Sequence, residues 1–276
     1  MRLRLDLSYD GSGFHGWAVQ PGLRTVQGEL EGALARVLRL EAVPVTCAGR
    51  TDTGVHARGQ VVHLDVDEET LTAAAGRSPG PPVKSLLRRL NGVLDPDVRV
   101  RAAVQAPAGF DARFSASWRR YVYRIADSPV TLDPLMRNHV VWWRRPLDER
   151  LMNDAAPALL GEHDFAAYCR PRPGATTVRE LLELRWQRSG GGILEATVRA
   201  DAFCHSMVRA LVGGLVSVGE RRRPPAWPAE VLTAGKRDPG VQVMAAAGLT
   251  LEEVAYPSDE ELAARAEKTR VVRVRG

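Results

Sequence analysis

The chain has 276 residues, of which 45% are hydrophobic and 26% charged, and this balance excludes a wholly disordered protein. The net charge of +5 favours a polyanionic partner only modestly, because nearly all the cations are arginines and base composition of a genome also produces that bias. The three cysteines lie far apart without a Cys-x-x-Cys motif, so we expect no disulfide framework and a reducing compartment. We find no signal-peptide pattern and no apolar run of membrane-spanning length, so we expect a cytoplasmic protein.

The first part of the chain alternates strand and helix patterns. Residues 2–9 alternate apolar and polar side chains and predict a half-buried strand that ends at the turn sequence DGSG. From Thr25, the expected N-cap, the apolar spacing becomes helical. Further predicted elements are strands at VPVTCA (43–48), VVHLDV (61–66) and DVRVRAAV (97–104), and a helix around residues 86–93.

The connector QAPAGFDARFSAS is the predicted domain boundary. Beyond it we predict strands at RRYVYRI (119–125) and NHVVWW (138–143), a helix at DERLMNDAAPALLG (148–161), a hairpin across SGGG (189–192), helices at HSMVRALVGGLVSV (205–218) and PAEVLTAG (228–235), and a strand at GLTLEEVAYP (248–257). Grouped strands without regular β-α-β alternation predict an α+β fold with a mainly antiparallel sheet. We expect an N-terminal half at 1–105, a C-terminal half at 106–257, and a charged tail at 258–276 that forms a peripheral helix or frays.

A loop between two predicted strands carries an unusual pair of charges. Gly49 and Gly54 bracket Arg50, Thr51 and Asp52. Glycines let a ligand or another backbone approach closely. An aspartate held ionised by a nearby arginine suits nucleophilic or base catalysis. The alternative is an aspartate that caps its own turn, with the arginine as a surface partner, and for this segment taken alone that alternative is the better one.

Two other stretches invite a functional interpretation. Arg119 and Arg120 precede Tyr121 and Tyr123, and aromatic rings beside arginines on a sheet are suited to base stacking. Two core tyrosines on a half-buried strand would give the same spacing. Arg209 interrupts an apolar helix, which calls either for a carboxylate partner or for a side chain that reaches solvent at the helix edge.

Metal and nucleotide sites are not supported by the sequence. His56, His63 and His163 have no cysteine or second carboxylate at ligand spacing, and no zinc-deaminase pattern is present. The sequence GSGFHG lacks the context of a dinucleotide fingerprint, and no Walker loop occurs. We therefore expect an activity without metal or cofactor.

Taken together, several stretches resemble the tRNA pseudouridine synthase A family, TruA, and they occur in that family's order. They are YDGSGFHGW with QPGLRTVQGELE, then AGRTDTGVHARGQVVH, FDARFSASWRRYVYRI and DAFCHSMVRALVGGL, and the match runs from residue 8 to about residue 256. The resemblance implies the pseudouridine synthase fold, two halves around a basic cleft, a homodimer, and neither metal nor cofactor. It also implies isomerisation of uridines 38, 39 and 40 in the anticodon stem-loop of tRNA.

The resemblance assigns roles to four residues. Asp52 matches the catalytic aspartate, and Arg50 the arginine that precedes it in the motif. Tyr121 matches the tyrosine that contacts the target base, and Arg209 the arginine that pairs with the catalytic carboxylate. Two rival hypotheses are a non-catalytic RNA-binding protein, which would need no such carboxylate, and a metal-dependent deaminase, which would need the missing ligands.

Overall fold

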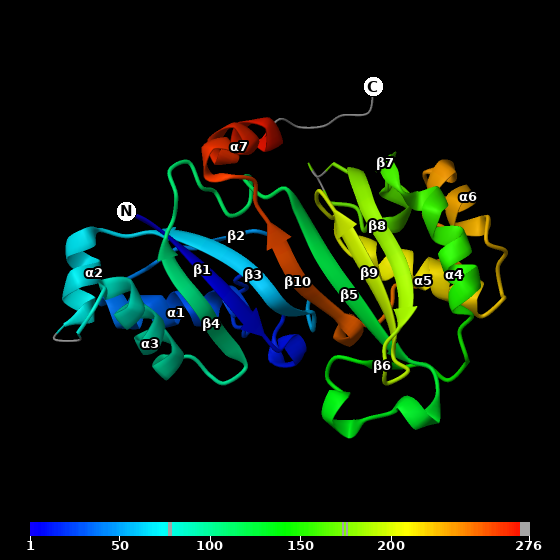
Figure 1. Ribbon diagram of the computed structural model, residues 1–276, viewed down its shortest axis with the longest axis horizontal. Coiled ribbons are helices and arrows are strands. Elements are labelled where there is room, and N and C mark those ends of the chain that lie inside the picture. Colours follow the sequence, from blue (N-terminus) through cyan, green and yellow to red (C-terminus); the bar gives the residue numbers. More distant parts are fainter. Residues whose placement is uncertain (77–78, 173, 175, 271–276) are drawn as a thin grey trace. The chain divides into compact units, whose positions relative to one another are not determined.

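The computed structural model describes residues 1–76, 79–172, 174 and 176–270 (Figure 1). The chain forms two compact units. The first comprises Met1–Ser117 and the C-terminal stretch that begins at Leu251, and the second comprises Trp118–Thr250. The sequence predicted domain boundaries at residues 105 and 257, and these boundaries stay a prediction.

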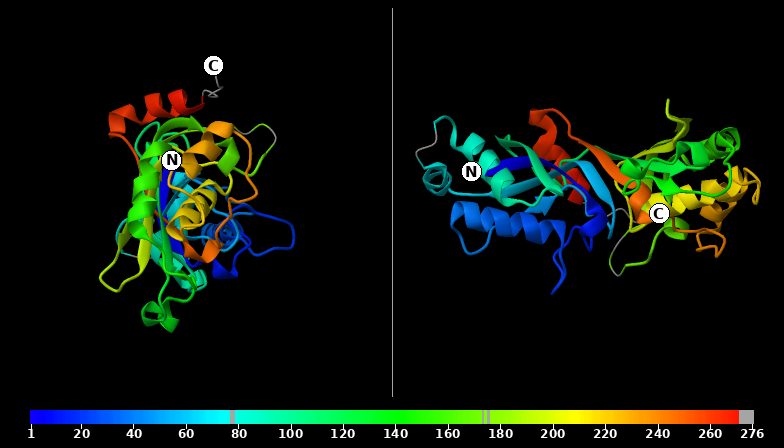
Figure 2. Two further views of the ribbon diagram at one scale, coloured as in Figure 1. Left: turned by 90° about the vertical axis from the view of Figure 1, so that its right-hand side faces the viewer. Right: turned by 90° about the horizontal axis from the view of Figure 1, so that it is seen from below.

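The first unit is built on antiparallel strands in the order β4-β1-β3. Its side chains alternate as expected, since Leu3, Leu5 and Leu7 are fully buried. Helix α1 begins after Thr25, whose hydroxyl accepts a hydrogen bond from the backbone of Gly28, and it packs on one face of this sheet (Figure 2). The elements are β1 (Arg2–Tyr9), α1 (Val26–Leu38), β2 (Thr46–Cys47), β3 (His56–Asp65), α2 (Glu68–Ala75), α3 (Pro82–Val93) and β4 (Val98–Gln105).

The second unit has antiparallel strands in the order β5-β9-β8-β7, with a short β6 parallel to β5. Helix α5 is almost entirely buried. The elements are β5 (Trp118–Ala126), β6 (Val141–Trp142), α4 (Glu149–Ala155), β7 (Gly161–Asp164), β8 (Val178–Arg188), β9 (Leu194–Ala200), α5 (Met207–Gly219) and α6 (Trp227–Ala234).

Two elements follow. Strand β10 (Leu249–Ala255) crosses from the second unit into the first, and helix α7 (Leu262–Arg270) belongs to the first. The carbonyl of Leu262 accepts a hydrogen bond from the Ser115 hydroxyl at 3.1 Å, so the tail forms a docked helix within residues 262–270.

The α+β class and the mainly antiparallel sheet are confirmed. Two predicted strands are shorter than expected, since only 46–47 of 43–48 and only 141–142 of 138–143 pair. Helix α2 and strand β7 were not predicted, because neither short segment has a strong periodicity.

Each unit closes an open strand edge with an asparagine from a neighbouring helix. The Asn91 amide donates to the carbonyl of Val100 at 2.8 Å and accepts from its N–H at 3.0 Å. The Asn153 amide does the same with Trp186, at 3.0 and 2.8 Å. These amides fix α3 beside β4 and α4 beside β8.

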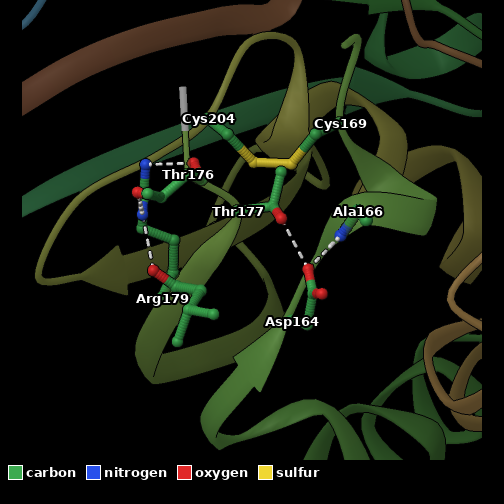
Figure 3. The surroundings of a disulfide bond; sticks show 8 residues. Asp164, Ala166, Cys169, Thr176, Thr177, Arg179 and Cys204 are labelled. Atoms are coloured by element: carbon green, nitrogen blue, oxygen red, sulfur yellow. Dashed lines mark hydrogen bonds between the residues drawn. A yellow bond between two sulfur atoms is a disulfide. The ribbon is translucent and has the colours of Figure 1, made fainter. Parts of the chain in front are cut away.

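The sequence did not predict a cysteine pair, only that no disulfide framework is present. The structure joins Cys169 to Cys204 in a disulfide (Figure 3), while Cys47 takes no part in one. The two cysteines are 35 residues apart, and sequence spacing alone does not reveal such a pair. Cysteine usage therefore no longer argues for a reducing compartment. Within residues 1–270, apart from the four undescribed positions, no helix is long and apolar enough to cross a membrane.

Candidate active site

Asp52 lies in the loop between β2 and β3, and neighbouring backbone fixes this loop. The N–H of Trp17 donates to the carbonyl of Thr51 at 3.0 Å, and the N–H of Gly54 donates to the carbonyl of Phe14 at 3.3 Å. Gly16 has a φ of +92°, and a Cβ there would lie 3.0 Å from the Thr51 carbonyl oxygen. Only glycine accommodates this close approach, so the loop carrying Asp52 rests directly on segment 14–17.

Buried side chains hold the same loop from the sheet side. The Thr51 hydroxyl lies 2.8 Å from the Tyr9 hydroxyl, which accepts a hydrogen bond from the Gln60 amide at 3.3 Å. The same amide donates to the carbonyl of Gly49 at 2.7 Å. Burial raises the pKa of the Tyr9 phenol, so it stays neutral and available as a hydrogen-bonding group. This Tyr9–Thr51–Gln60 network fixes the residues on either side of Arg50.

Asp52 and Arg50 differ in exposure. Thr51 is buried, whereas Asp52 beside it is half-buried and Arg50 is exposed. A carboxylate on a fixed loop, with one side accessible and a cation nearby, can act on a bound substrate as a nucleophile or base.

His56 has a structural partner at the loop's end. Its Nδ1 accepts a hydrogen bond from the N–H of Gly11 at 3.0 Å and lies 3.1 Å from a carboxylate oxygen of Asp10. In the described part of the chain, no group of three or more His, Cys, Asp or Glu side chains is arranged to hold a metal ion.

Tyr121 and Tyr123 have different surroundings in the second unit. Tyr123 is fully buried and donates to the carbonyl of Ala245 at 2.8 Å, so it is the core residue that the alternative hypothesis expected. Tyr121 is 7% exposed, and its ring lies edge-on to Phe203 with a centroid separation of 5.1 Å. Phe203 directly precedes the disulfide residue Cys204.

Arg209 lies in the first turns of α5 and is half-buried. Its Nε donates to the carbonyl of Met244 at 2.6 Å, and the N–H of Met244 donates back to the carbonyl of Arg209 at 3.2 Å. Tyr123 bonds the next carbonyl, at Ala245. Helix α5 and strand β5 are therefore both anchored to the segment 244–245.

The four predicted site residues thus fall into two pairs. The structure places Asp52 and Arg50 on one loop of the first unit, and Tyr121 and Arg209 on β5 and α5 of the second. Sequence reasoning missed the supporting residues Tyr9, Gln60 and Phe203. The one available signal was Gln60, a polar residue directly before the apolar pair Val61–Val62 of β3, where it is completely buried.

Matches to known proteins extend over nearly the whole chain. A family model described as tRNA pseudouridine synthase matches residues 155–257. The chain is 58% identical to the tRNA pseudouridine synthase A of Streptomyces griseus, over 99% of this chain and 94% of that protein. It is 60% identical to the protein of the same name from Frankia casuarinae, over 99% of this chain and 96% of that protein. The tRNA pseudouridine synthase A of Mycobacterium leprae is 49% identical, over 99% of this chain and 96% of that protein. The chain therefore belongs to the tRNA pseudouridine synthase A family.

Proposed function

We propose that this protein isomerises uridine to pseudouridine in tRNA, at positions 38, 39 and 40 of the anticodon stem-loop, with Asp52 as the reactive carboxylate. The observation that carries the proposal is the loop itself. A half-buried carboxylate stands on a loop fixed by Gly16 and by the Tyr9–Thr51–Gln60 network, in a chain that belongs to this family.

The reaction rearranges one nucleotide without adding or removing atoms. The N1–C1′ glycosidic bond breaks, the uracil rotates, and C5 becomes bonded to C1′. The hydrogen of C5 leaves as a proton to water, and N1 takes up a proton in its place. Three roles suit an ionised Asp52: attack on C1′, addition to the base, and removal of the 2′ proton. A rigid loop serves each of them, because a fixed carboxylate needs little reorganisation on reaching the transition state.

The other three residues act on the substrate or on the carboxylate. The target base must leave its stack, which costs a few kcal/mol, and Tyr121 offsets this by contacting the extruded uracil. Arg50, exposed beside Asp52, supplies a cation for the RNA backbone. By the family resemblance Arg209 has the role of the arginine that pairs with the catalytic carboxylate, and its bond to Met244 orients the guanidinium.

The protein acts in the cytoplasm, where tRNA is processed, and as a homodimer without metal or cofactor. In the dimer one subunit holds the anticodon arm while the body of the same tRNA contacts the other. Sedimentation that shows a fully active monomer would remove the homodimer from this proposal.

Tritium release tests the activity. Unmodified tRNA labelled at uridine C5 is incubated with the protein in EDTA, and tritium appears in water only when C5 becomes bonded to ribose. We expect release from positions 38–40. Binding of tRNA without release would indicate an RNA-binding protein, and release that EDTA abolishes would indicate a metal-dependent enzyme.

A further inference from the structure

A basic groove lies on the first unit, between helix α3 and strand β4. Figure 1 shows these two elements side by side. It is lined by Lys84, Leu87, Arg88, Asn91, Gly92 and Arg99. Lys84 and Arg88 come from the helix and Arg99 from the strand, and all three are exposed. The next exposed cation on β4 is Arg101, which lies where the pairing of β4 with β1 shifts register.

The groove carries a net positive charge. None of its six lining residues is acidic. The segment 82–105 holds five cations and two acids, Asp95 and Asp97. Both acids accept hydrogen bonds from Arg24, at 3.0 and 2.6 Å, and the bond with Asp97 raises the pKa of the Arg24 guanidinium. The two carboxylates of this segment are therefore already engaged with a cation outside the groove.

The walls of the groove are held at a fixed separation. Asn91, in the groove, binds both the N–H and the carbonyl of Val100 on the edge strand. The cations of α3 therefore face those of β4 across a constant gap. The same bonds occupy the strand edge at Val100, so a peptide cannot add there as a further strand. A polyanion fits this surface, and strand addition by a protein does not.

The groove begins at the end of the sheet that carries the Asp52 loop. Tyr9, at the end of β1, pairs with Ala57 near the start of β3 and with Val98 at the start of β4. With adjacent strands about 4.8 Å apart, the start of β4 lies about 10 Å across the sheet from the start of β3. An RNA with a uridine at Asp52 is thus within reach of the groove, in a unit that contains both.

We propose that the α3–β4 groove binds the sugar–phosphate backbone of the substrate tRNA, away from the base that reacts. This inference rests on the proposed function for the identity of the polyanion. The groove positions the RNA and takes no part in the chemistry, so it contributes to tRNA affinity and to KM, and leaves kcat unchanged.

Gly92 allows a test that removes no side chain. A Cβ at Gly92 meets nothing within 4 Å, so Gly92→Glu places a negative charge in the groove without a clash. Gly92→Gln is the neutral control of equal size. Gly32 of α1 also has open space around its Cβ and does not line the groove, so Gly32→Glu is the matched charge control. Thermal unfolding of all three variants confirms that each one folds.

The measurements are tRNA binding by filter retention and tritium release. Removing one cation–phosphate interaction should weaken binding about eightfold at about 0.1 M salt and reduce the log–log salt slope by about 0.9. We expect this for Gly92→Glu, whose carboxylate offsets one cation, with KM raised and kcat retained. For Lys84→Gln combined with Arg99→Gln, which removes two cations, the reduction in slope should be about 1.8. We expect Gly32→Glu to bind as wild type does. Gly92→Gln should bind more tightly than Gly92→Glu and keep the wild-type salt slope, because it adds bulk to the groove without charge.

Two outcomes separate this inference from the proposed function. If wild type releases tritium and Gly92→Glu binds tRNA as Gly32→Glu does, the groove inference is overturned, and its cations only protect the sheet edge from association. If wild type binds tRNA without releasing tritium, the proposed function fails, while a loss of binding in Gly92→Glu still supports the groove.

Discussion

At the residue scale, Asp52 is positioned by groups that are distant in sequence. The Tyr9–Thr51 contact spans 42 residues and the Tyr9–Gln60 contact spans 51. A loop supported by this network and by backbone bonds to segment 14–17 can keep its shape when the carboxylate is changed. A substitution of Asp52 should therefore affect the reaction without affecting the stability of the protein.

Asp52→Asn should abolish turnover while the protein still folds and binds tRNA. Asparagine keeps the shape of the side chain and some hydrogen bonding, but it removes the charge and the nucleophilicity that each proposed role requires. Most tRNA affinity comes from phosphate contacts elsewhere, so binding should stay near wild type. The assay is tritium release, with thermal unfolding as the control for folding. Substantial release by this variant would mean that another group does the chemistry.

Tyr121→Ala should lose turnover and Tyr121→Phe should keep most of it. Stacking of a base on an aromatic ring is worth about 1–3 kcal/mol, so the alanine variant should be slower by about 5- to 150-fold. Phenylalanine keeps the ring and its edge-on contact with Phe203. Single-turnover rates at saturating enzyme test both variants. Equal losses in the two would show that the hydroxyl, and not the ring, is required.

The candidate site could be predicted from sequence only in part. The residues of the Asp52 loop are contiguous, so a motif identifies them. Tyr9, Gln60 and Phe203 act through long-range contacts that no local pattern encodes. The Tyr121 and Tyr123 spacing could not distinguish a site residue from a core residue, because both positions fall on one face of β5.

At the element scale, most helices and strands follow from periodicity, and the exceptions are short. Helix α5 shows what periodicity cannot reveal. It is apolar on nearly every face because it is covered on several sides, and adjacent glycines in it meet different neighbours. A Cβ at Gly213 would lie 1.7 Å from the carbonyl oxygen of Gln242, whereas a Cβ at Gly214 would lie 3.4 Å from the ring of Tyr168.

Gly213→Ala should therefore destabilise the protein and Gly214→Ala should not. Overpacking against backbone costs about 1–3 kcal/mol or more, and the gain in helix propensity from Gly to Ala, about 1 kcal/mol, does not offset it. At Gly214 the gain in propensity meets only an ordinary contact. Urea unfolding of the two variants gives the comparison. Similar midpoints would mean that segment 242–244 shifts freely, and Arg209, bonded to Met244, would then have no fixed support.

An ion pair with a buried carboxylate and a partly exposed arginine joins elements of the second unit. Asp127 accepts hydrogen bonds from the Arg188 guanidinium at 2.7 Å and from the N–H of Leu147 at 2.8 Å. Burial alone would raise the pKa of the Asp127 carboxyl, but the bonds to Arg188 and Leu147 and the charge of Arg188 outweigh it and lower the pKa. A lowered folded-state pKa stabilises the protein above the unfolded value of about 4, and this contribution is lost as pH falls through the folded-state pKa.

Asp127→Asn should thus cost about 2–3 kcal/mol of unfolding free energy at pH 7, the worth of hydrogen bonds to a charged group. The difference in unfolding free energy between Asp127→Asn and wild type should become smaller as pH falls below about 4, because the wild-type carboxyl then becomes neutral as well. Asp65→Asn is the control, since Asp65 forms a similar pair with Arg2 but its side chain is 65% exposed. Exposed pairs contribute about 1 kcal/mol or less. A difference that persists unchanged at low pH would exclude charge as the cause.

At the scale of the whole molecule, the C-terminal part of the chain belongs to the same compact unit as the N-terminal part. After the second unit, β10 and α7 join the first unit, where the N–H of Ser117 donates to the carbonyl of Ala255 at 2.8 Å. Gly59 of β3 also closely approaches the backbone of Glu252. The class of the fold follows from local patterns, but this return joins residues nearly 200 positions apart, and local patterns do not specify such a partner.

The charge of the molecule leads to the last prediction, which concerns salt. The chain has 38 Lys and Arg against 33 Asp and Glu, and several acids are engaged by arginines, as Asp97 is by Arg24 and Asp127 by Arg188. Affinity for tRNA should therefore fall linearly on a log–log plot against salt, with a slope of about −0.9 for each phosphate neutralised on duplex-like RNA. The rate at saturating tRNA should stay nearly constant over the same range, because the Asp52 loop is held by hydrogen bonds and backbone packing and not by exposed ion pairs.

Asp52→Asn separates tRNA affinity from reaction rate. Its affinity should show the wild-type salt slope, while it should have no turnover at any salt concentration. A duplex DNA of similar length, compared over the same salt range, measures the part of the slope that needs no tRNA. A flat response with tRNA would place the RNA on a surface other than the exposed arginines, and would remove both Arg50 and the α3–β4 groove from the binding site.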